Sequence, residues 1–110
     1  MATLLVRLAE ESARRDETLR TGTCAQLRDA LAEIMPAGAR VWVFGSLVKP
    51  GRFHTESDVD VAVESLPAGR SEYWLQGELE ARLGRRVDVV LFAETRLRAA
   101  ITREGEQWTL

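Results

Sequence analysis

The fold of this chain is decided by residues 41–63, which read VWVFGSLVKPGRFHTESDVDVAV. The segment begins with residues 41–44, a short apolar run of β-branched and aromatic side chains that is typical of a strand. It ends with residues 59–63, where valines alternate with an aspartate and an alanine at the two-residue period of a strand. Because Gly45-Ser46 and Pro50-Gly51 interrupt the pattern, the segment predicts two strands joined by a loop.

A long helix is predicted before these strands. Apolar residues recur at helical spacing through residues 3–34, and although Gly22 interrupts the pattern we expect one helix rather than two. Its first turns carry an apolar stripe of Leu4, Leu5 and Leu8. Packing within the chain is the simpler explanation of this stripe, and contact with a partner helix is the alternative.

Further elements are predicted after residue 63. A helix over residues 71–83 begins with a serine that can cap it, and residues 87–92 form a third apolar strand. A short helix over 94–104 would turn Leu97 inward, and residues 108–110 would add an edge strand or stay loose. This order predicts an α/β (α+β) fold, in which a small mixed sheet is flanked by helices.

Composition fits one folded domain. The chain has 110 residues, of which 45% are hydrophobic and 29% charged, as in ordinary globular proteins. We therefore expect a single domain over residues 1–110, with the helix over 3–34 preceding a core over 40–104 and no second substrate-binding domain.

Charge and cysteine content restrict the function classes. The formal net charge is -2, so stable nucleic-acid binding is not expected. The single cysteine, Cys24, cannot form an internal disulfide or a cysteine-rich zinc site. Because the sequence has no signal-like start and no apolar run of membrane-spanning length, we expect no membrane association and a cytoplasmic location.

Three of the five aspartates fall where strands are predicted. Asp58 and Asp60 belong to the second predicted strand, and Asp88 belongs to the third. Aspartate is disfavoured in strands and costly to desolvate, so such positions tend to mark functional sites. Asp58 and Asp60 should project from the same face, and Asp88 joins them if the two strands are neighbours. Three such carboxylates would repel unless a cation lay among them, and magnesium fits oxygen ligands of this kind.

Gly45 and Ser46 predict a phosphate site. They follow a strand and open a helical turn, where exposed backbone N–H groups can bind an anion. Lys49 and Arg52 lie just beyond and could reach phosphate oxygens. His54, the only histidine, is interpreted as a solvated loop residue and receives no role.

Each aspartate also has a plain structural explanation. Asp58 could be a turn residue, because turns favour aspartate. Asp60 could face solvent from an edge strand. Asp88 could pair with Arg85 or Arg86, two arginines that we otherwise expect on a solvated surface.

The motif as a whole resembles a known family. Residues 44–46, Phe-Gly-Ser, are followed after eleven residues by Asp58-Val59-Asp60, which resembles the signature of the DNA polymerase beta-type nucleotidyltransferases. Residues 87–90 resemble that family's third carboxylate strand. The short chain is similar to its minimal members, the MNT proteins that occur beside HEPN-domain proteins in toxin–antitoxin pairs.

The resemblance implies a role for each matching residue. Gly45 and Ser46 match the positions that hold the triphosphate, and Asp58 and Asp60 match the metal-binding pair. Asp88 matches the third acid, which binds the catalytic metal and assists deprotonation of the acceptor hydroxyl. Two Mg2+ ions and ATP as nucleotide donor are implied. The loop is one residue longer than in the usual minimal pattern, which leaves the roles of Lys49, Arg52 and His54 open.

The implied function is that of an antitoxin which transfers AMP from ATP to a tyrosine hydroxyl of a HEPN ribonuclease toxin. Two alternatives stay open: a non-catalytic antitoxin that neutralises its toxin by binding, and a small-molecule nucleotidyltransferase of the aminoglycoside type. The sequence leaves open the nucleotide preference, the acceptor, the number of nucleotides transferred, magnesium versus manganese, and whether the chain forms a homo-oligomer.

Overall fold

The computed structural model describes residues 3–110. In chain order its elements are α1 (Leu4–Ile34), β1 (Arg40–Phe44), the 3-10 turn η1 (Gly45–Val48), β2 (Val59–Val63), α2 (Glu72–Leu83), β3 (Val87–Leu91), α3 (Arg98–Glu104) and β4 (Glu106–Thr109). The predicted α+β fold with one long first helix is confirmed. No helix within residues 3–110 is long and apolar enough to cross a bilayer.

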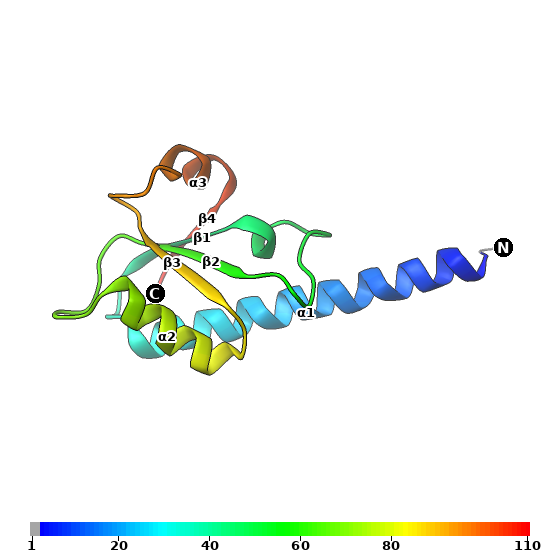
Figure 1. Cartoon of the computed structure of the whole chain (residues 1–110), viewed down its shortest axis with the longest axis horizontal. Helices are drawn as coiled ribbons and strands as arrows, with labels where there is room; N and C mark the ends of the chain where they lie inside the picture. Colours follow the sequence, from blue (N-terminus) through cyan, green and yellow to red (C-terminus); the bar gives the residue numbers. More distant parts are fainter. Residues whose placement is uncertain (1–2) are drawn as a thin grey trace.

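The four strands form one mixed sheet in the order β3-β2-β1-β4. Strand β1 is antiparallel to both β2 and β4, and β2 is parallel to β3. Helices α1 and α2 lie together along one face of the sheet, whereas α3 lies beyond the other (Figure 1). The residue alternation explains this layering, because valines at alternate positions of β1, β2 and β3 point to the side of α1 and α2.

The main core lies between the sheet and these two helices. It contains fully buried leucines of α1 and α2, packed against valines of the central strands. They include Leu27, Leu31, Leu75, Leu79, Val43, Val61 and Val87. Burial of such side chains contributes roughly 1.5–3 kcal/mol each, so this layer fixes which face of the sheet is left for the aspartates.

Helix α1 runs unbroken through Gly22 and is much longer than the sheet that it supports. Its N-terminal half extends past the rest of the molecule (Figure 1). As a result Leu4, Leu5 and Leu8 are 63%, 77% and 50% exposed. The expectation that this stripe packs within the chain is therefore wrong, because no other element reaches that far along the helix.

The later elements follow their predicted signals, with one exception. The Ser71 hydroxyl accepts a hydrogen bond from the Trp74 N–H at 3.2 Å, which caps α2 as expected. Of the two alternatives for the end of the chain, the edge strand is the one that forms: it is β4, which begins earlier than expected, at Glu106, and Trp108 on it is buried. Helix α3 begins only at Arg98, however, so Leu97 stands outside it and is 51% exposed rather than turned inward.

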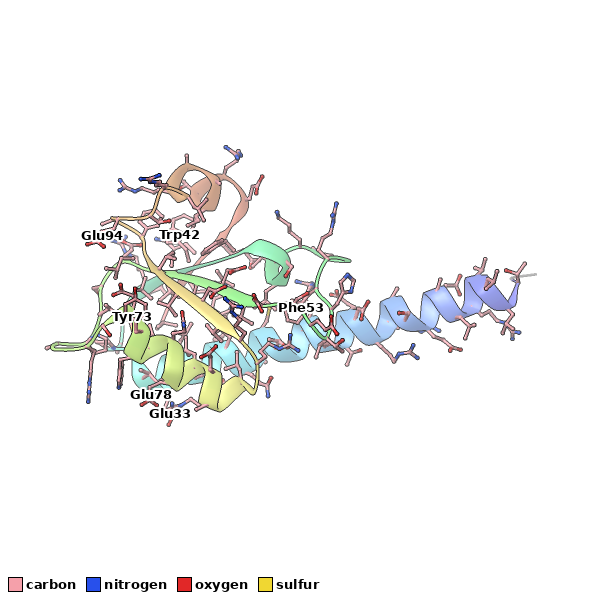
Figure 2. All side chains as sticks on the ribbon, viewed as in Figure 1. Glu33, Trp42, Phe53, Tyr73, Glu78 and Glu94 are labelled. Carbon is pink, nitrogen blue, oxygen red and sulfur yellow. The ribbon has the colours of Figure 1, made fainter. Side chains whose placement is uncertain are left out.

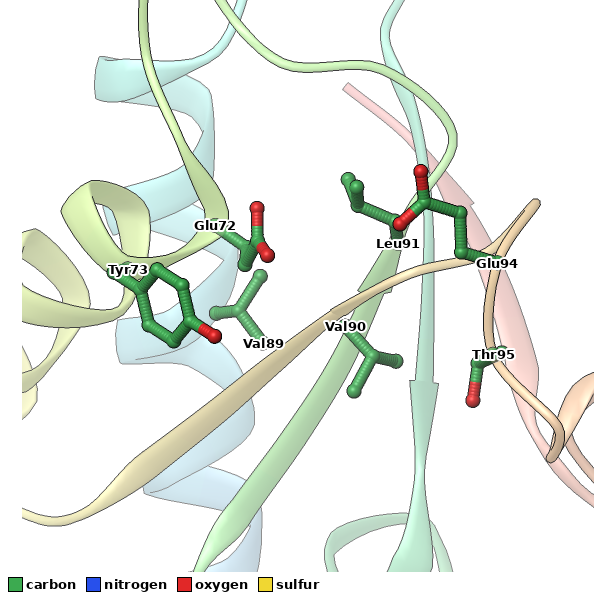
Figure 3. Close-up of a pocket in the computed structure, with 7 residues that line it drawn as sticks. All are labelled: Glu72, Tyr73, Val89, Val90, Leu91, Glu94 and Thr95. Atoms are coloured by element: carbon green, nitrogen blue, oxygen red, sulfur yellow. The ribbon is translucent and has the colours of Figure 1, made fainter.

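The outer edge of β3 is covered by α2 rather than left open. The Val87 and Val89 N–H groups donate to side-chain oxygens of Glu80 at 3.1 Å and Gln76 at 3.2 Å. A hollow of about 250 Å³ continues along this edge, and Tyr73 lies at its rim (Figure 3). Because the Val87 and Val89 donors are already paired, this part of the edge is protected against addition of another strand.

Candidate active site

Three aspartates come together on the face of the sheet that is turned away from α1 and α2. Asp60 on β2 pairs in register with Asp88 on the adjacent parallel strand β3. Asp58 lies one residue before β2, not inside it as expected, and two residues from Asp60. The predicted convergence of Asp58, Asp60 and Asp88 therefore has its geometric basis in the parallel pairing of β2 with β3.

The Gly45-Ser46 turn lies directly against this acidic group. Strand β1 pairs Phe44 with Asp60, so the residue that follows β1 reaches the carboxylate. Gly45 has a φ of 74°, and a Cβ atom added there would collide with Oδ2 of Asp60. Only glycine tolerates both conditions, and it brings the backbone of the turn against the Asp60 carboxylate.

Two hollows flank the Gly45-Ser46 turn. One, of about 400 Å³, is lined by Ser46, Lys49 and Arg52. The other, of about 140 Å³, lies between Gly45 and α3, and the exposed Leu97 contributes to its wall. Lys49 lines both and pairs with Glu104 at 3.4 Å. The Ser46 hydroxyl and the two cationic side chains around one hollow are groups suited to binding phosphate oxygens.

The acids repel each other in the absence of a cation. Burial, together with the negative charges of Asp88 and Asp58, raises the pKa of Asp60 to about 6. Desolvation and like-charge repulsion both disfavour the ionised carboxylate. A bound cation would remove this cost.

The raised pKa of Asp60 predicts a stability that falls as pH rises. The folded protein holds this proton more tightly than the unfolded chain, whose Asp pKa is 3.8, so stability is lost between about pH 4 and pH 6. At pH 7.5 in EDTA we expect the free energy of unfolding of Asp60→Asn to be about 1–2 kcal/mol higher than that of the unchanged protein. At pH 4 we expect the two free energies to be about equal. Thermal unfolding measured across this pH range would check it; an equal difference at both pH values would contradict it.

Arg86 lies between two of the acids. Its Nε is 3.8 Å from Oδ2 of Asp58 and 3.6 Å from Oδ1 of Asp88. The alternative that Asp88 pairs with a surface arginine is thus partly realised, although the Arg86 side chain is 71% exposed and such contacts contribute little. Within residues 3–110, no group of three or more His, Cys, Asp or Glu side chains is placed so that it could hold a metal ion.

Two residues that support the site were not identified from the sequence. Phe53 is 1% exposed and anchors the loop between η1 and β2 in the core (Figure 2). Arg85 stacks over its ring at 4.7 Å and donates to the Ser57 carbonyl at 2.7 Å. The expectation that Arg85 is a solvated surface residue is therefore wrong: it fixes the loop immediately before Asp58.

The same loop is also tied to α1. The His54 ring lies 3.0 Å from a carboxylate oxygen of Asp16, and both side chains are partly exposed. Arg20 donates to the Leu47 carbonyl of η1 at 3.1 Å while it pairs with Glu17. Helix α1 thus supports both ends of the segment that joins the Gly45-Ser46 turn to the acids.

The chain matches a known sequence family over most of its length. The family described as nucleotidyltransferase domain matches residues 24–107, which include the Gly45-Ser46 turn and all three aspartates. No curated protein matches the sequence.

Solved structures share the fold. A protein described as a minimal nucleotidyltransferase is 34% identical, with a TM-score of 0.56 over 82% of this chain and 92% of its own. A toxin–antitoxin structure with AMP-PNP is 23% identical, with a TM-score of 0.61 over 78% of this chain and 73% of the other. The third is a complex of a tri-AMPylated Shewanella oneidensis HEPN toxin with an MNT antitoxin. It is 17% identical, with a TM-score of 0.56 over 83% of this chain and 73% of the other.

Proposed function

We propose a function from the premise that this chain belongs to the nucleotidyltransferase domain family. In this proposal it transfers AMP from ATP to a tyrosine hydroxyl of a HEPN ribonuclease toxin and so acts as the antitoxin of that toxin. One observation carries the catalytic part of the proposal. Asp60 and Asp88 stand in register on adjacent strands while the Gly45-Ser46 turn touches the Asp60 carboxylate. Acids and an anion-binding turn in contact are what nucleotide transfer requires.

The acidic group fits magnesium. Asp58, Asp60 and Asp88 offer only carboxylate oxygens, which hard divalent cations prefer. The pKa of Asp60 is raised by its burial and by the charges of Asp88 and Asp58, and a cation would offset both effects. These three residues would hold the metal, which when bound would neutralise charge on the triphosphate and favour ionisation of the attacking hydroxyl.

The remaining residues would bind and orient the substrates. Backbone N–H groups of the Gly45-Ser46 turn and the Ser46 hydroxyl would hold phosphate oxygens, with Lys49 and Arg52 facing the same hollow. The acceptor oxygen would attack the α-phosphorus in line, its proton would pass to Asp88, and the bond to the leaving pyrophosphate would break. Holding these groups in position supplies much of the rate in phosphoryl transfer.

The structural relatives support the choice of acceptor. The Shewanella complex pairs an MNT antitoxin with a HEPN toxin that carries AMP, and another relative was solved with AMP-PNP. Transfer of AMP from ATP to a toxin is the reaction that joins these two descriptions. A tyrosine hydroxyl is a suitable nucleophile for it, because it can be deprotonated more readily than an aliphatic hydroxyl.

Labelled ATP tests the proposal directly. The protein is mixed with magnesium and a HEPN toxin. We expect ATP labelled at the α-phosphate to yield a labelled toxin, and ATP labelled at the γ-phosphate to yield an unlabelled one. Peptide mass spectrometry should place the added AMP on tyrosine. Toxin neutralisation without label would favour the binding-only antitoxin, and label on an added aminoglycoside alone would favour the small-molecule enzyme; either result contradicts the proposal.

A further inference from the structure

The projecting half of α1 carries an exposed row of side chains that the active site does not use. Its members are all exposed and follow one another at alternating steps of four and three residues: Leu4, Leu8, Glu11, Arg15 and Thr18. This spacing places them in one line on the helix and is the spacing of a coiled-coil seam. The row lies outside residues 24–107, the part of the chain that the nucleotidyltransferase family covers.

The middle of this row is hollowed and charged. A depression of about 380 Å³ is lined by Glu11, Arg14, Arg15 and Thr18. Within residues 3–110 none of its three charged side chains has an ion-pair partner, and all of them are exposed. These four positions also form the kind of four-residue hole into which a facing helix inserts one side chain.

We propose that this row binds the same row of a second copy of the chain, with the two α1 helices antiparallel. Antiparallel pairing about the centre of the row sets Glu11 of each copy opposite Arg15 of the other. The Glu11 carboxylate of one copy then enters the hollow of the other, between Arg14 and Arg15. A two-fold axis repeats the contact, which makes the charges self-complementary.

The ends of the row complement each other in size. In the same register Leu8 faces Thr18, and Leu4 faces Gly22. Among the described residues, none places an atom within 4 Å of a Cβ at Gly22, so an incoming leucine finds space there. The two leucines of the row, Leu4 and Leu8, would thus be covered in each copy along a contact of about 28 Å, which is the length of residues 4–22 in a helix.

The globular parts of the two copies do not obstruct this contact. The core-facing residues Leu27 and Leu31 of α1 lie on the opposite side of the helix from the row. The projecting half leads away from the sheet and its other helices (Figure 1). Each sheet would therefore stand at one end of the paired helices, with both active sites accessible.

Charge exchange tests the pairing while the fold stays intact. In sedimentation equilibrium at about 50 µM the unchanged protein should be a dimer. Glu11→Arg alone and Arg14→Glu with Arg15→Glu should each weaken dimerisation by about tenfold or more, because like charges then meet. An equimolar mixture of the two variants, or all three substitutions in one chain, should restore it. Glu10→Arg, an exposed charge off the row, is the matched control and should leave the dimer unchanged.

Two further measurements separate the outcomes. In a Cys24→Ser background, a mixture of Leu8→Cys and Thr18→Cys chains should form a mixed disulfide, since these positions face each other only in the antiparallel arrangement. A monomeric unchanged protein, a dimer insensitive to the Glu11 and Arg15 exchanges, or disulfides only between two Leu8→Cys chains would each overturn the proposal. Loss of toxin binding by Leu4→Glu in a protein that is monomeric alone would assign the row to the toxin instead.

Discussion

Replacing Asp58 and Asp60 together by asparagine should lower the rate of nucleotide transfer by about 10³-fold or more. The two substitutions remove two of the three carboxylates that come together at Asp58, Asp60 and Asp88, and asparagine keeps nearly the same size. Without these charges a magnesium ion has too few anionic ligands, and the charge that develops on the transferred phosphate is not neutralised. The rate of α-label transfer at saturating ATP and magnesium is the measurement.

The controls for this variant separate catalysis from folding and from partner binding. Asp29→Asn, at an exposed position on α1, makes the same chemical change away from the site and should leave the rate unchanged. The double variant should stay folded, since loss of the Asp60 charge relieves repulsion rather than creating it. Retention of full transfer would disprove the assigned role. Retained toxin neutralisation by a variant that no longer transfers AMP would show that binding alone inhibits the toxin.

The strands and the acids were predictable because both follow from local pattern. The valine alternation in residues 59–63 sets which side chains face the core, so Asp60 had to lie on the opposite face. Convergence with Asp88 needed one further fact, the pairing of β2 with β3. Two strands joined by a helix such as α2 commonly pair in parallel, which makes that neighbourhood the expected one.

The residues that the sequence did not reveal act over long distances in the chain. Phe53 is an aromatic residue in a loop rich in turn formers, and no periodicity marks it as buried. Arg85 contacts that loop from 28 residues away, a relation that no local pattern encodes. The exposure of Leu4 and Leu8 has the same origin, because an apolar stripe alone does not say how far the rest of the fold extends along a helix.

The second large effect is expected from Gly45→Ala. The added Cβ would collide with Oδ2 of Asp60 and lie 3.3 Å from its Cγ, so either the turn or the carboxylate must shift. Alanine also pays about 1–2 kcal/mol for the left-handed backbone conformation at a φ of 74°. Because a displacement of about 1 Å in a catalytic group can cost 10²-fold, we expect transfer to fall by about that factor or more. Stability should fall by about 2–4 kcal/mol, since overpacking adds to the backbone cost.

Gly51→Ala provides the matched control, because it shares the backbone conformation without the collision. Gly51 has a φ of 82°, and none of the described residues comes within 4 Å of a Cβ there, so only the backbone cost of about 1–2 kcal/mol should remain, with transfer nearly unchanged. A double-mutant cycle then isolates the contact: in an Asp60→Ala background, Gly45→Ala should destabilise the protein no more than Gly51→Ala does. Denaturant unfolding of the four variants measures this coupling. Gly45→Ala could instead lower the free energy of unfolding by the same amount with and without the Asp60 carboxylate. That result would show that the turn and the acid are not in contact. The proposed phosphate site would then be separate from the proposed metal site.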